Sequence, residues 1–173
     1  ELFRTTRERA YLEAFDGLFA GLKLDPTAPV SFHDQGMAAA WAYLMTPDPR
    51  RDPDLVERAR RALLAGADWR LEQMESHPFR APQHPAIQLT GWGSFAHSTR
   101  ATLPLLQAWS ITGEVRYRRG AWVTTDVQLG ANPQGLSYIT GIGARWPRHP
   151  LSKLSQYDDV AEPLQGIPVN GPH

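Results

Sequence analysis

The sequence predicts an all-α protein built as an array of antiparallel helical hairpins. Three observations predict this fold. Apolar residues recur at intervals of three and four in five or so segments, helix start and stop signals bound these segments, and short turns alternate with long connections. A helical bundle and a toroid of helical hairpins both fit this pattern.

The first half of the chain contains several helix signals in order. Residues 1–22 are expected to form two short helices or one bent helix, and the proline-containing segment 25–34 a loop. Residues 35–45 form an alanine-rich helix that stops at Thr46 and Pro47, because a residue before proline disfavours helix.

A longer helix is expected from Asp52 and Pro53 to about Ser76, since an aspartate N-cap followed by proline is a preferred helix start. Its expected core-facing residues are Leu55, Ala59, Leu63, Ala67, Leu71 and Met74, and its expected water-facing residues are Arg58, Arg61, Glu72 and Glu75.

The second half begins with a proline-rich connector over 77–93 and a helix over 94–112. The apolar stripe of that helix is expected to be Phe95, Thr99, Thr102, Leu106 and Trp109. Pro104 is expected to kink or split it. A helix over 114–129 then ends at Gly130, a candidate left-handed C-cap. Residues 130–173 lack regular helix, and irregular segments of this length in a compact domain are usually functional.

Composition excludes several classes of function. A chain of 173 residues with 42% apolar residues can bury one core, so a single folded unit is expected. The 18 Lys and Arg balance the 18 Asp and Glu, which argues against nucleic acid as a partner. The absence of cysteine excludes disulfides, thiolate nucleophiles and Cys-ligated metals. No apolar run reaches membrane-spanning length, and the first residue is Glu1, which points to a processed product or a piece of a longer chain.

Several short motifs in the second half occur in a defined order. They are Gly91-Trp92-Gly93-Ser94, Ile111-Thr112-Gly113 with Tyr117, Leu129-Gly130-Ala131-Asn132-Pro133, and Ser137-Tyr138-Ile139-Thr140-Gly141-Ile142-Gly143. Their order and spacing resemble the C-terminal half of glycoside hydrolase family 9, the inverting cellulases and related exo-acting glucosidases and glucosaminidases. The upstream helices and the tract over 158–172 are also similar to that family.

The resemblance implies an (α/α)6 barrel whose loops form an open sugar-binding cleft at one end. It implies that 1–129 are helical hairpins and that 130–173 are loops of the substrate cleft. The partners expected are a poly- or oligosaccharide substrate and the remainder of the catalytic domain, and the expected location is secreted or periplasmic. No cofactor and no metal are expected.

The resemblance also assigns candidate substrate-binding residues. They are Trp92, Ser94, Tyr138, Arg148, Lys153, Ser155 and Asp158. Trp92, Tyr138, Arg148, Lys153 and Asp158 are expected on one concave surface, with Trp92 stacked on a sugar ring.

The chain departs from the family at one substrate-binding motif. Where the family usually has Pro-His-His-Arg-x-Ser, this chain has Pro150, Leu151, Ser152, Lys153, Leu154 and Ser155. Lys153 supplies a positive donor but lacks the planar fork of arginine. Because Arg145 and Arg148 lie nearby in sequence, a polysaccharide with anionic substituents fits at least as well as cellulose.

The resemblance implies that the catalytic carboxylates lie elsewhere. An inverting glycosidase uses two carboxyl groups roughly 6.5–9.5 Å apart. In the family the base aspartates lie upstream of the Trp92 motif, and the acid glutamate follows the tract over 158–172. This chain is therefore expected to contain no catalytic residue and to be inactive alone.

Other interpretations of single residues remain open. Trp92 suits a core position as well as a sugar platform, and Asp158 and Asp159 suit loop capping, hydrogen bonding or metal binding better than a catalytic pair. His97 fits polar packing, and Gly141 with Gly143 does not fit a dinucleotide fingerprint. Possible metal ligands are His33, Asp34 and His84, but isolated residues of this kind are more often structural. A solvated basic face is the interpretation of Arg116, Arg118 and Arg119.

Two alternatives come from different functional classes. One is a noncatalytic carbohydrate-binding or scaffold protein on the same fold. The other is a polysaccharide lyase or sugar epimerase built on a helical toroid.

Overall fold

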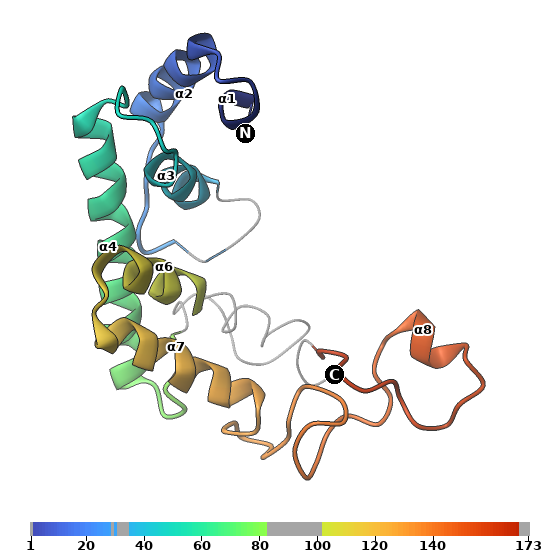
Figure 1. The fold of residues 1–173 in the computed structure, drawn as a ribbon. Helices are drawn as coiled ribbons and strands as arrows, with labels where there is room; N and C mark the ends of the chain where they lie inside the picture. Colours follow the sequence, from blue (N-terminus) through green and yellow to red (C-terminus); the bar gives the residue numbers. More distant parts are fainter. Residues whose placement is uncertain (1, 29, 31–34, 83–101, 170–173) are drawn as a thin grey trace.

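The computed structural model describes residues 2–28, 30, 35–82 and 102–169 (Figure 1). Its helices are α1 (Leu2–Thr6), α2 (Arg9–Gly21), α3 (Gly36–Leu44), α4 (Pro53–Ser76), α6 (Thr102–Thr112), α7 (Val115–Gln128) and α8 (Lys153–Gln156). Within these residues there is no strand, and one isolated antiparallel bridge joins Ile139 to Pro168. The prediction of an all-α hairpin array is confirmed.

The N-terminal segment forms two helices rather than one bent helix. Arg7 separates α1 from α2 with a φ of 65°, a left-handed conformation that interrupts a helix. The ring of Phe19 on α2 stacks on that of Tyr43 on α3, with centroids 4.7 Å apart. The Tyr43 hydroxyl donates to Asp16 Oδ1 over 2.6 Å, and burial raises the pKa of this phenol. These contacts fasten α2 to α3.

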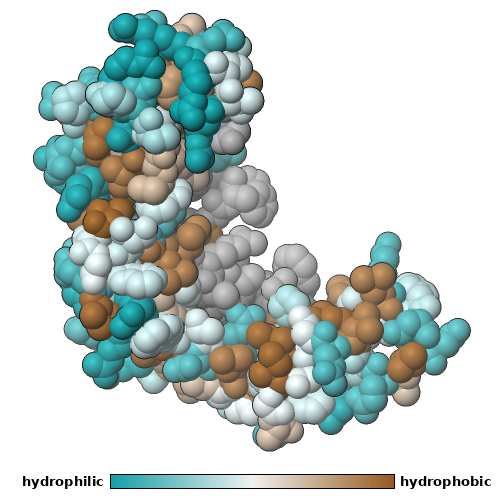
Figure 2. Space-filling view, in the orientation of Figure 1, coloured by the Kyte–Doolittle hydropathy of each residue, from teal (hydrophilic) through white to brown (hydrophobic). Residues whose placement is uncertain are grey.

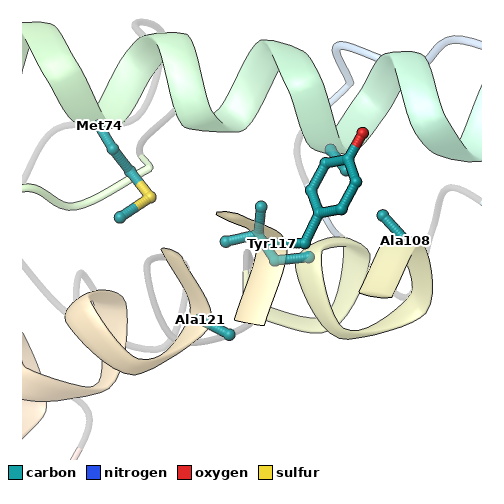
Figure 3. Packing of buried hydrophobic residues seen from close by; sticks show 6 residues of the cluster. Met74, Ala108, Tyr117 and Ala121 are labelled. Atoms are coloured by element: carbon teal, nitrogen blue, oxygen red, sulfur yellow. The ribbon is translucent and has the colours of Figure 1, made fainter. Parts of the chain in front are cut away.

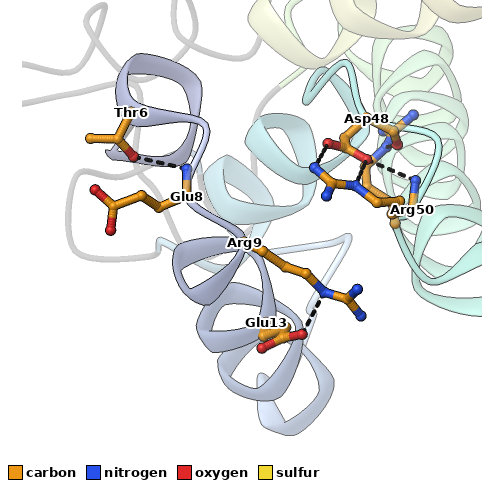
Figure 4. A network of polar contacts seen from close by, with 7 residues as sticks. Thr6, Glu8, Arg9, Glu13, Asp48 and Arg50 are labelled. Atoms are coloured by element: carbon orange, nitrogen blue, oxygen red, sulfur yellow. Dashed lines mark hydrogen bonds and ion pairs between the residues drawn. The ribbon is translucent and has the colours of Figure 1, made fainter.

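The long helix α4 begins as its sequence predicts. Asp52 Oδ1 accepts from the backbone N–H of Asp54 over 2.8 Å and of Leu55 over 3.4 Å, and Pro53 follows it directly. Just before this cap, Asp48 accepts two side-chain hydrogen bonds from Arg50, of 2.9 Å and 2.7 Å (Figure 4). These hydrogen bonds lower the pKa of the Asp48 carboxyl to about 2.

Two arginines of α4 connect it to the N-terminal segment. Arg58 was expected to face water, but its guanidinium donates to the carbonyls of Phe19, Ala20 and Leu22 at the end of α2. That expectation was wrong because a helix C-terminus presents unpaired carbonyls that attract a cation. Arg70 is 4% exposed and donates to Pro26 O over 2.9 Å. Burial lowers the pKa of Arg70 to about 10, so it stays charged at neutral pH.

The α6–α7 hairpin packs on the second half of α4, whereas α3 packs on the first half (Figure 1). The cluster between α4, α6 and α7 consists of Ala67, Met74, Leu105, Ala108, Tyr117 and Ala121 (Figure 3). Tyr117 rises from α7 toward α4, where its hydroxyl donates to Asp68 Oδ1 over 2.8 Å (Figure 3). Burial raises its pKa to about 12. Gly113, with a φ of 72°, makes the turn between α6 and α7.

The apolar stripe predicted for α6 is wrong in its described part. The buried residues of α6 are Pro104, Leu105, Gln107 and Ala108, whereas Leu106 is 41% and Trp109 36% exposed. Pro104 lies in the first turn of α6 as the structure describes it, where a missing N–H removes no intrahelical hydrogen bond. Residues 94–101, which were also assigned to this helix, lie outside the described part.

The C-terminal segment is irregular, as expected, apart from one turn of helix, α8. It leaves α7 at Gly130, whose φ is 126°. In Figure 1 it extends away from the helices, and Figure 2 shows apolar side chains gathered over the arm that carries α8. The most exposed apolar side chains of that arm are Leu151, Leu154 and Tyr157, each more than three quarters exposed.

Candidate functional site

A buried asparagine organises the turn that follows α7. Asn132 is 6% exposed. Its Nδ2 donates to Val127 O over 2.7 Å and to Leu136 O over 2.8 Å, and its Oδ1 accepts from Gln134 N–H over 3.1 Å. The bond to Val127 O pairs a carbonyl in the last turn of α7 that the helix leaves unpaired, and the other two bonds join Asn132 to the segment that follows. The turn therefore holds the next segment in a fixed direction.

Tyr138 lies in the core beneath this turn. Its ring is 1% exposed and packs with Ala81, Val127 and Val169, and its hydroxyl donates to Gln134 Oε1 over 2.5 Å. Burial raises the pKa of this phenol. A ring packed in this way offers no face to a ligand, so its expected place on the concave surface is not supported by the described residues.

Thr140 closes the base of the loop formed by residues 141–166. Its side chain is fully buried, and its Oγ1 donates to Leu164 O over 2.5 Å and accepts from Ile167 N–H over 2.9 Å. Its backbone adds an N–H bond to Ile167 O over 3.1 Å and accepts from Gly166 N–H over 2.8 Å. Because these hydrogen bonds join the two ends of the loop, its first and last residues lie next to each other.

An arginine and a tryptophan stack inside this loop. The Arg148 guanidinium lies over the Trp146 ring, with Cζ 4.4 Å from the centroid. Arg148 Nη1 also donates to Glu162 Oε2 over 2.8 Å, across the loop. The stacking and the ion pair together restrict the guanidinium to one region.

A cavity of about 270 Å³ opens beside Arg148. Its lining residues are Arg148, His149, Pro150, Ser155, Gln156, Val160, Ala161 and Pro163. Ser155 Oγ accepts from Leu164 N–H over 3.2 Å, which ties α8 to the far side of the loop. Two of the candidate substrate residues, Arg148 and Ser155, therefore meet at one concavity.

Lys153 and Asp158 lie near this cavity in sequence but do not line it. Lys153 is exposed on α8. Asp158 Oδ1 accepts from Val160 N–H over 3.1 Å, so Asp158 caps a turn, as one of the interpretations of this residue predicts. Asp159 has a φ of 58°, a left-handed conformation that asparagine and aspartate tolerate better than most residues.

Comparison with known protein families identifies the family of the whole chain. Residues 1–173 match Glycosyl hydrolase family 9. The chain belongs to glycosyl hydrolase family 9.

Relatives of known activity come from this family. The chain is 33% identical over 123 residues to a xyloglucan-specific endo-β-1,4-glucanase of Bacteroides ovatus, covering 70% of this chain and 21% of that protein. It is 25% identical over 171 residues to endoglucanase D of Acetivibrio thermocellus, covering 99% of this chain and 27% of that protein. The chain thus spans about a quarter of the length of these relatives.

Solved family 9 structures share the fold. A metagenome-derived family 9 endoglucanase superposes with a TM-score of 0.84 at 26% identity, over 99% of this chain and 30% of that one. A thermostable endoglucanase from Alicyclobacillus acidocaldarius gives 0.83 at 29% identity, over 99% and 32%. The chain is therefore part of a family 9 (α/α)6 barrel.

Two of the family 9 substrate candidates, Trp92 and Ser94, lie outside the described residues. The same holds for His33, Asp34, His84 and His97, which also lie outside the described residues.

Among residues 2–28, 30, 35–82 and 102–169 no group of three or more metal-ligating side chains converges. No helix in the same ranges is long and apolar enough to cross a membrane.

Sequence reasoning missed three residues that build the family 9 loop. Thr140 lies in the Ser137–Gly143 motif but was given no role, Trp146 precedes Arg148 by two positions, and Glu162 gave no signal because its partner is fourteen residues away.

A larger concavity of about 850 Å³ lies between α4 and α7, remote from the loop. Its charged lining residues are Asp68, Glu72, Glu75, Arg80, Arg116 and Arg119.

Proposed function

We propose that this chain forms part of the substrate cleft of an inverting glycoside hydrolase that acts on β-1,4-linked glucans. Membership of family 9 supports hydrolysis of a glycosidic bond. The names of the relatives, a xyloglucan-specific endo-β-1,4-glucanase and an endoglucanase, support a β-linked glucan as the substrate. Residues 1–129 supply helical hairpins, and residues 130–173 supply cleft loops.

The single observation that carries this proposal is the loop closed by Thr140, which holds Arg148 on Trp146 beside a cavity that Ser155 also borders. A guanidinium donates hydrogen bonds to sugar hydroxyls, and the Trp146 ring supports it from the side away from the cavity lining. The cavity is large enough for part of a sugar residue, with the chain of the glucan continuing past it.

The charge around Arg148 favours a neutral glucan. Glu162 pairs with Arg148 over 2.8 Å, so the positive charge at the cavity is largely balanced. Arg148 then serves as a directional donor rather than as an anion-binding site.

A second candidate substrate, a glucan with anionic substituents, is supported by Lys153. This lysine is exposed, and no ion pair joins it to another described residue. It stands at the position where the family usually has arginine, so an acidic group on a glucan side chain could be recognised there.

The proton-transfer carboxylates of the enzyme are proposed to lie outside these 173 residues. The adjacent pair Asp158 and Asp159 does not suit catalysis, because Asp158 caps a turn and Asp159 belongs to the same exposed bend. The chain alone is therefore proposed to be inactive, and the remainder of the catalytic domain to complete the site. Because its substrate is a polymer, the protein is proposed to act outside the cytoplasmic membrane.

The test uses the complete catalytic domain that contains these residues. Incubation with xyloglucan and with cello-oligosaccharides is expected to release reducing ends, and proton NMR is expected to show the α-anomer first, as inversion of a β-linkage requires. Release of the β-anomer would exclude inversion. Unsaturated products that absorb in the ultraviolet would identify a lyase, and binding without products would identify a noncatalytic protein.

A further inference from the structure

The concavity between α4 and α7 lies apart from the loop over 141–166. Its volume is about 850 Å³, and its lining residues belong to α4, to α7 and to Arg80 after the end of α4. No residue of α6 lines it, although α6 packs on both of these helices. This space, called the α4–α7 concavity, is therefore distinct from the core between the three helices.

The base of the α4–α7 concavity is apolar. Met74 is buried, and Leu71 and Val123 are half-buried. Gly120, which adds no side chain, lies beside Leu71 and Met74. Burial of apolar surface is favourable, so a ligand gains free energy when it covers this base. The base suits a flat apolar surface of a ligand.

Charged side chains form the two walls above this base. On α4 the spacing of four and three residues places three carboxylates on one side of the helix: Asp68, Glu72 and Glu75. On α7 the facing wall carries Arg116 and Arg119, which are exposed, as a solvated basic face predicts, whereas Arg118 is half-buried and does not line the concavity. One wall therefore accepts hydrogen bonds, and the other donates them.

One end of the α4–α7 concavity is fixed, and the rest of its charged groups have no partner in the described part of the chain. Arg116 Nη1 lies 2.8 Å from Asp68 Oδ1 in an ion pair that joins the two walls. The side chains of Glu72, Glu75 and Arg119 are exposed, and no ion pair joins them to another described residue. Their hydrogen-bonding groups are available to a ligand.

The charges around the α4–α7 concavity balance. Three carboxylates and three guanidinium groups line it, since Arg80 adds a third positive charge. A small anion or cation would meet like charges as well as opposite ones. A neutral ligand with several hydroxyl groups avoids this conflict, because each hydroxyl donates to a carboxylate or accepts from a guanidinium. Hydrogen bonds to charged groups are also stronger than those between neutral groups.

We propose that the α4–α7 concavity is a second carbohydrate site, which binds a chain of neutral β-linked glucan away from the cleft. A β-linked glucose residue presents C–H groups on its faces and hydroxyl groups around its edge. Its face covers the base formed by Leu71, Met74 and Val123, and its hydroxyls meet the two charged walls. The choice of a glucan rests on the proposed function, but binding here requires no catalysis in the cleft.

Affinity electrophoresis of the complete catalytic domain tests this site. The gel contains hydroxyethylcellulose, a neutral soluble β-glucan. Glu72→Ala combined with Arg119→Ala removes one acceptor and one donor from the walls and is expected to raise the dissociation constant at least about fivefold. The matched control combines Glu57→Ala with Arg61→Ala, an exposed pair on α4 outside the concavity, and is expected to leave it unchanged.

Hydrolysis of cellotetraose separates this site from the cleft. Both double variants are expected to keep the kcat/KM of the unsubstituted domain, because neither changes a residue of the loop over 141–166. An unchanged dissociation constant for Glu72→Ala with Arg119→Ala would overturn the proposal of a second site. If binding depends on these residues but cellotetraose is not hydrolysed, the second site is supported and the proposed function alone fails.

Carboxylate labelling of the unsubstituted domain keeps the test valid if a variant fails to fold. With hydroxyethylcellulose well above its dissociation constant, carbodiimide-driven labelling of Glu72 and Glu75 is expected to slow at least about threefold, and that of Glu57 to stay the same. Equal rates with and without the polymer would overturn the proposal. Labelling that speeds up on dilution without polymer would also overturn it, because a second copy of the protein would then occupy the concavity.

Discussion

Gly120 of α7 lies so close to Leu71 of α4 that a methyl group added to the glycine would be 2.6 Å from Leu71 Cδ2. The same methyl group would be 3.4 Å from Leu105 Cδ1 and 3.6 Å from Met74 Sδ. The absence of a side chain at this position therefore sets how closely the two helices approach.

Gly120→Ala is expected to lower the free energy of unfolding by about 1–3 kcal/mol, the usual cost of overpacking a core. The matched control is Gly17→Ala on α2, where no heavy atom lies within 4 Å of the added methyl group. That change is expected to raise the free energy of unfolding by about 0.5–1 kcal/mol, because alanine favours helix over glycine. Denaturant unfolding measures both, and stabilisation by Gly120→Ala would contradict the packing argument.

Thr140→Val keeps the shape of the buried side chain and removes both of its hydrogen bonds at the base of the loop. A loss of about 1–3 kcal/mol is expected, because the Leu164 carbonyl and the Ile167 N–H lose their partner. Limited proteolysis of the complete domain is expected to cleave within 141–166 more rapidly. Thr140→Ser retains the hydroxyl and is expected to restore protection.

The control for Thr140 is Thr125→Val on α7. Thr125 is exposed, and its Oγ1 donates only to Ala121 O of its own helix, over 2.9 Å. The change is expected to alter the free energy of unfolding by less than about 0.5 kcal/mol. If it weakened the loop as much as Thr140→Val, the special role of Thr140 would be lost.

Asp48→Asn is expected to remove part of the acid sensitivity of folding. The hydrogen bonds from Arg50 lower the Asp48 pKa from its ordinary 3.8 to about 2 in the folded chain. Between these values the unfolded chain binds more protons, so this group stabilises folding above about pH 4 and loses its effect as the pH falls to about 2. Unfolding measured from pH 2 to 6 is expected to show a shallower slope for Asp48→Asn than for the unsubstituted chain, and an unchanged slope would contradict the role of the Asp48 carboxyl.

Lys153→Ala separates the two candidate substrates. If Lys153 binds an anionic substituent, its loss is expected to weaken binding of an anionic glucan more than that of a neutral one, and added salt is expected to shrink the difference. Isothermal titration of the complete domain with xyloglucan and with a carboxymethylated glucan measures this. Equal effects on both ligands would leave the neutral glucan as the substrate.

Trp92→Ala is expected to weaken binding of an oligosaccharide by about 1–3 kcal/mol, the cost of losing a well-buried aromatic contact. Helical content measured by circular dichroism is expected to change little. If the substituted domain instead fails to fold, the interpretation of Trp92 as a core residue is correct.

Local signals predicted the helices well. The cap at Asp52, the stop before Pro47 and the exit at Gly130 act within a few residues, so the sequence alone contains them. The short helix α8 was missed because a single turn carries too few residues to show a periodicity.

Contacts between distant segments escaped prediction. Arg58 meets carbonyls of α2 that are 36 to 39 residues away, and Glu162 meets Arg148 across the loop. Periodicity describes which side of a helix is apolar, but it does not identify the partner that covers that side. This limit explains α6, where Leu105 packs on α4 and Trp109 remains exposed.

The hydrogen bonds that join the two ends of the loop over 141–166 make the residues within the loop structurally independent of the helices before it. Thr140, Gly166 and Ile167 join the two ends, and the bridge between Ile139 and Pro168 continues this pairing. Because the cost of closing a loop rises only slowly with its length, residues can be added or exchanged between these ends without moving α7. The loop over 141–166 is thus a natural unit for transplantation, because both of its ends lie at one point of attachment.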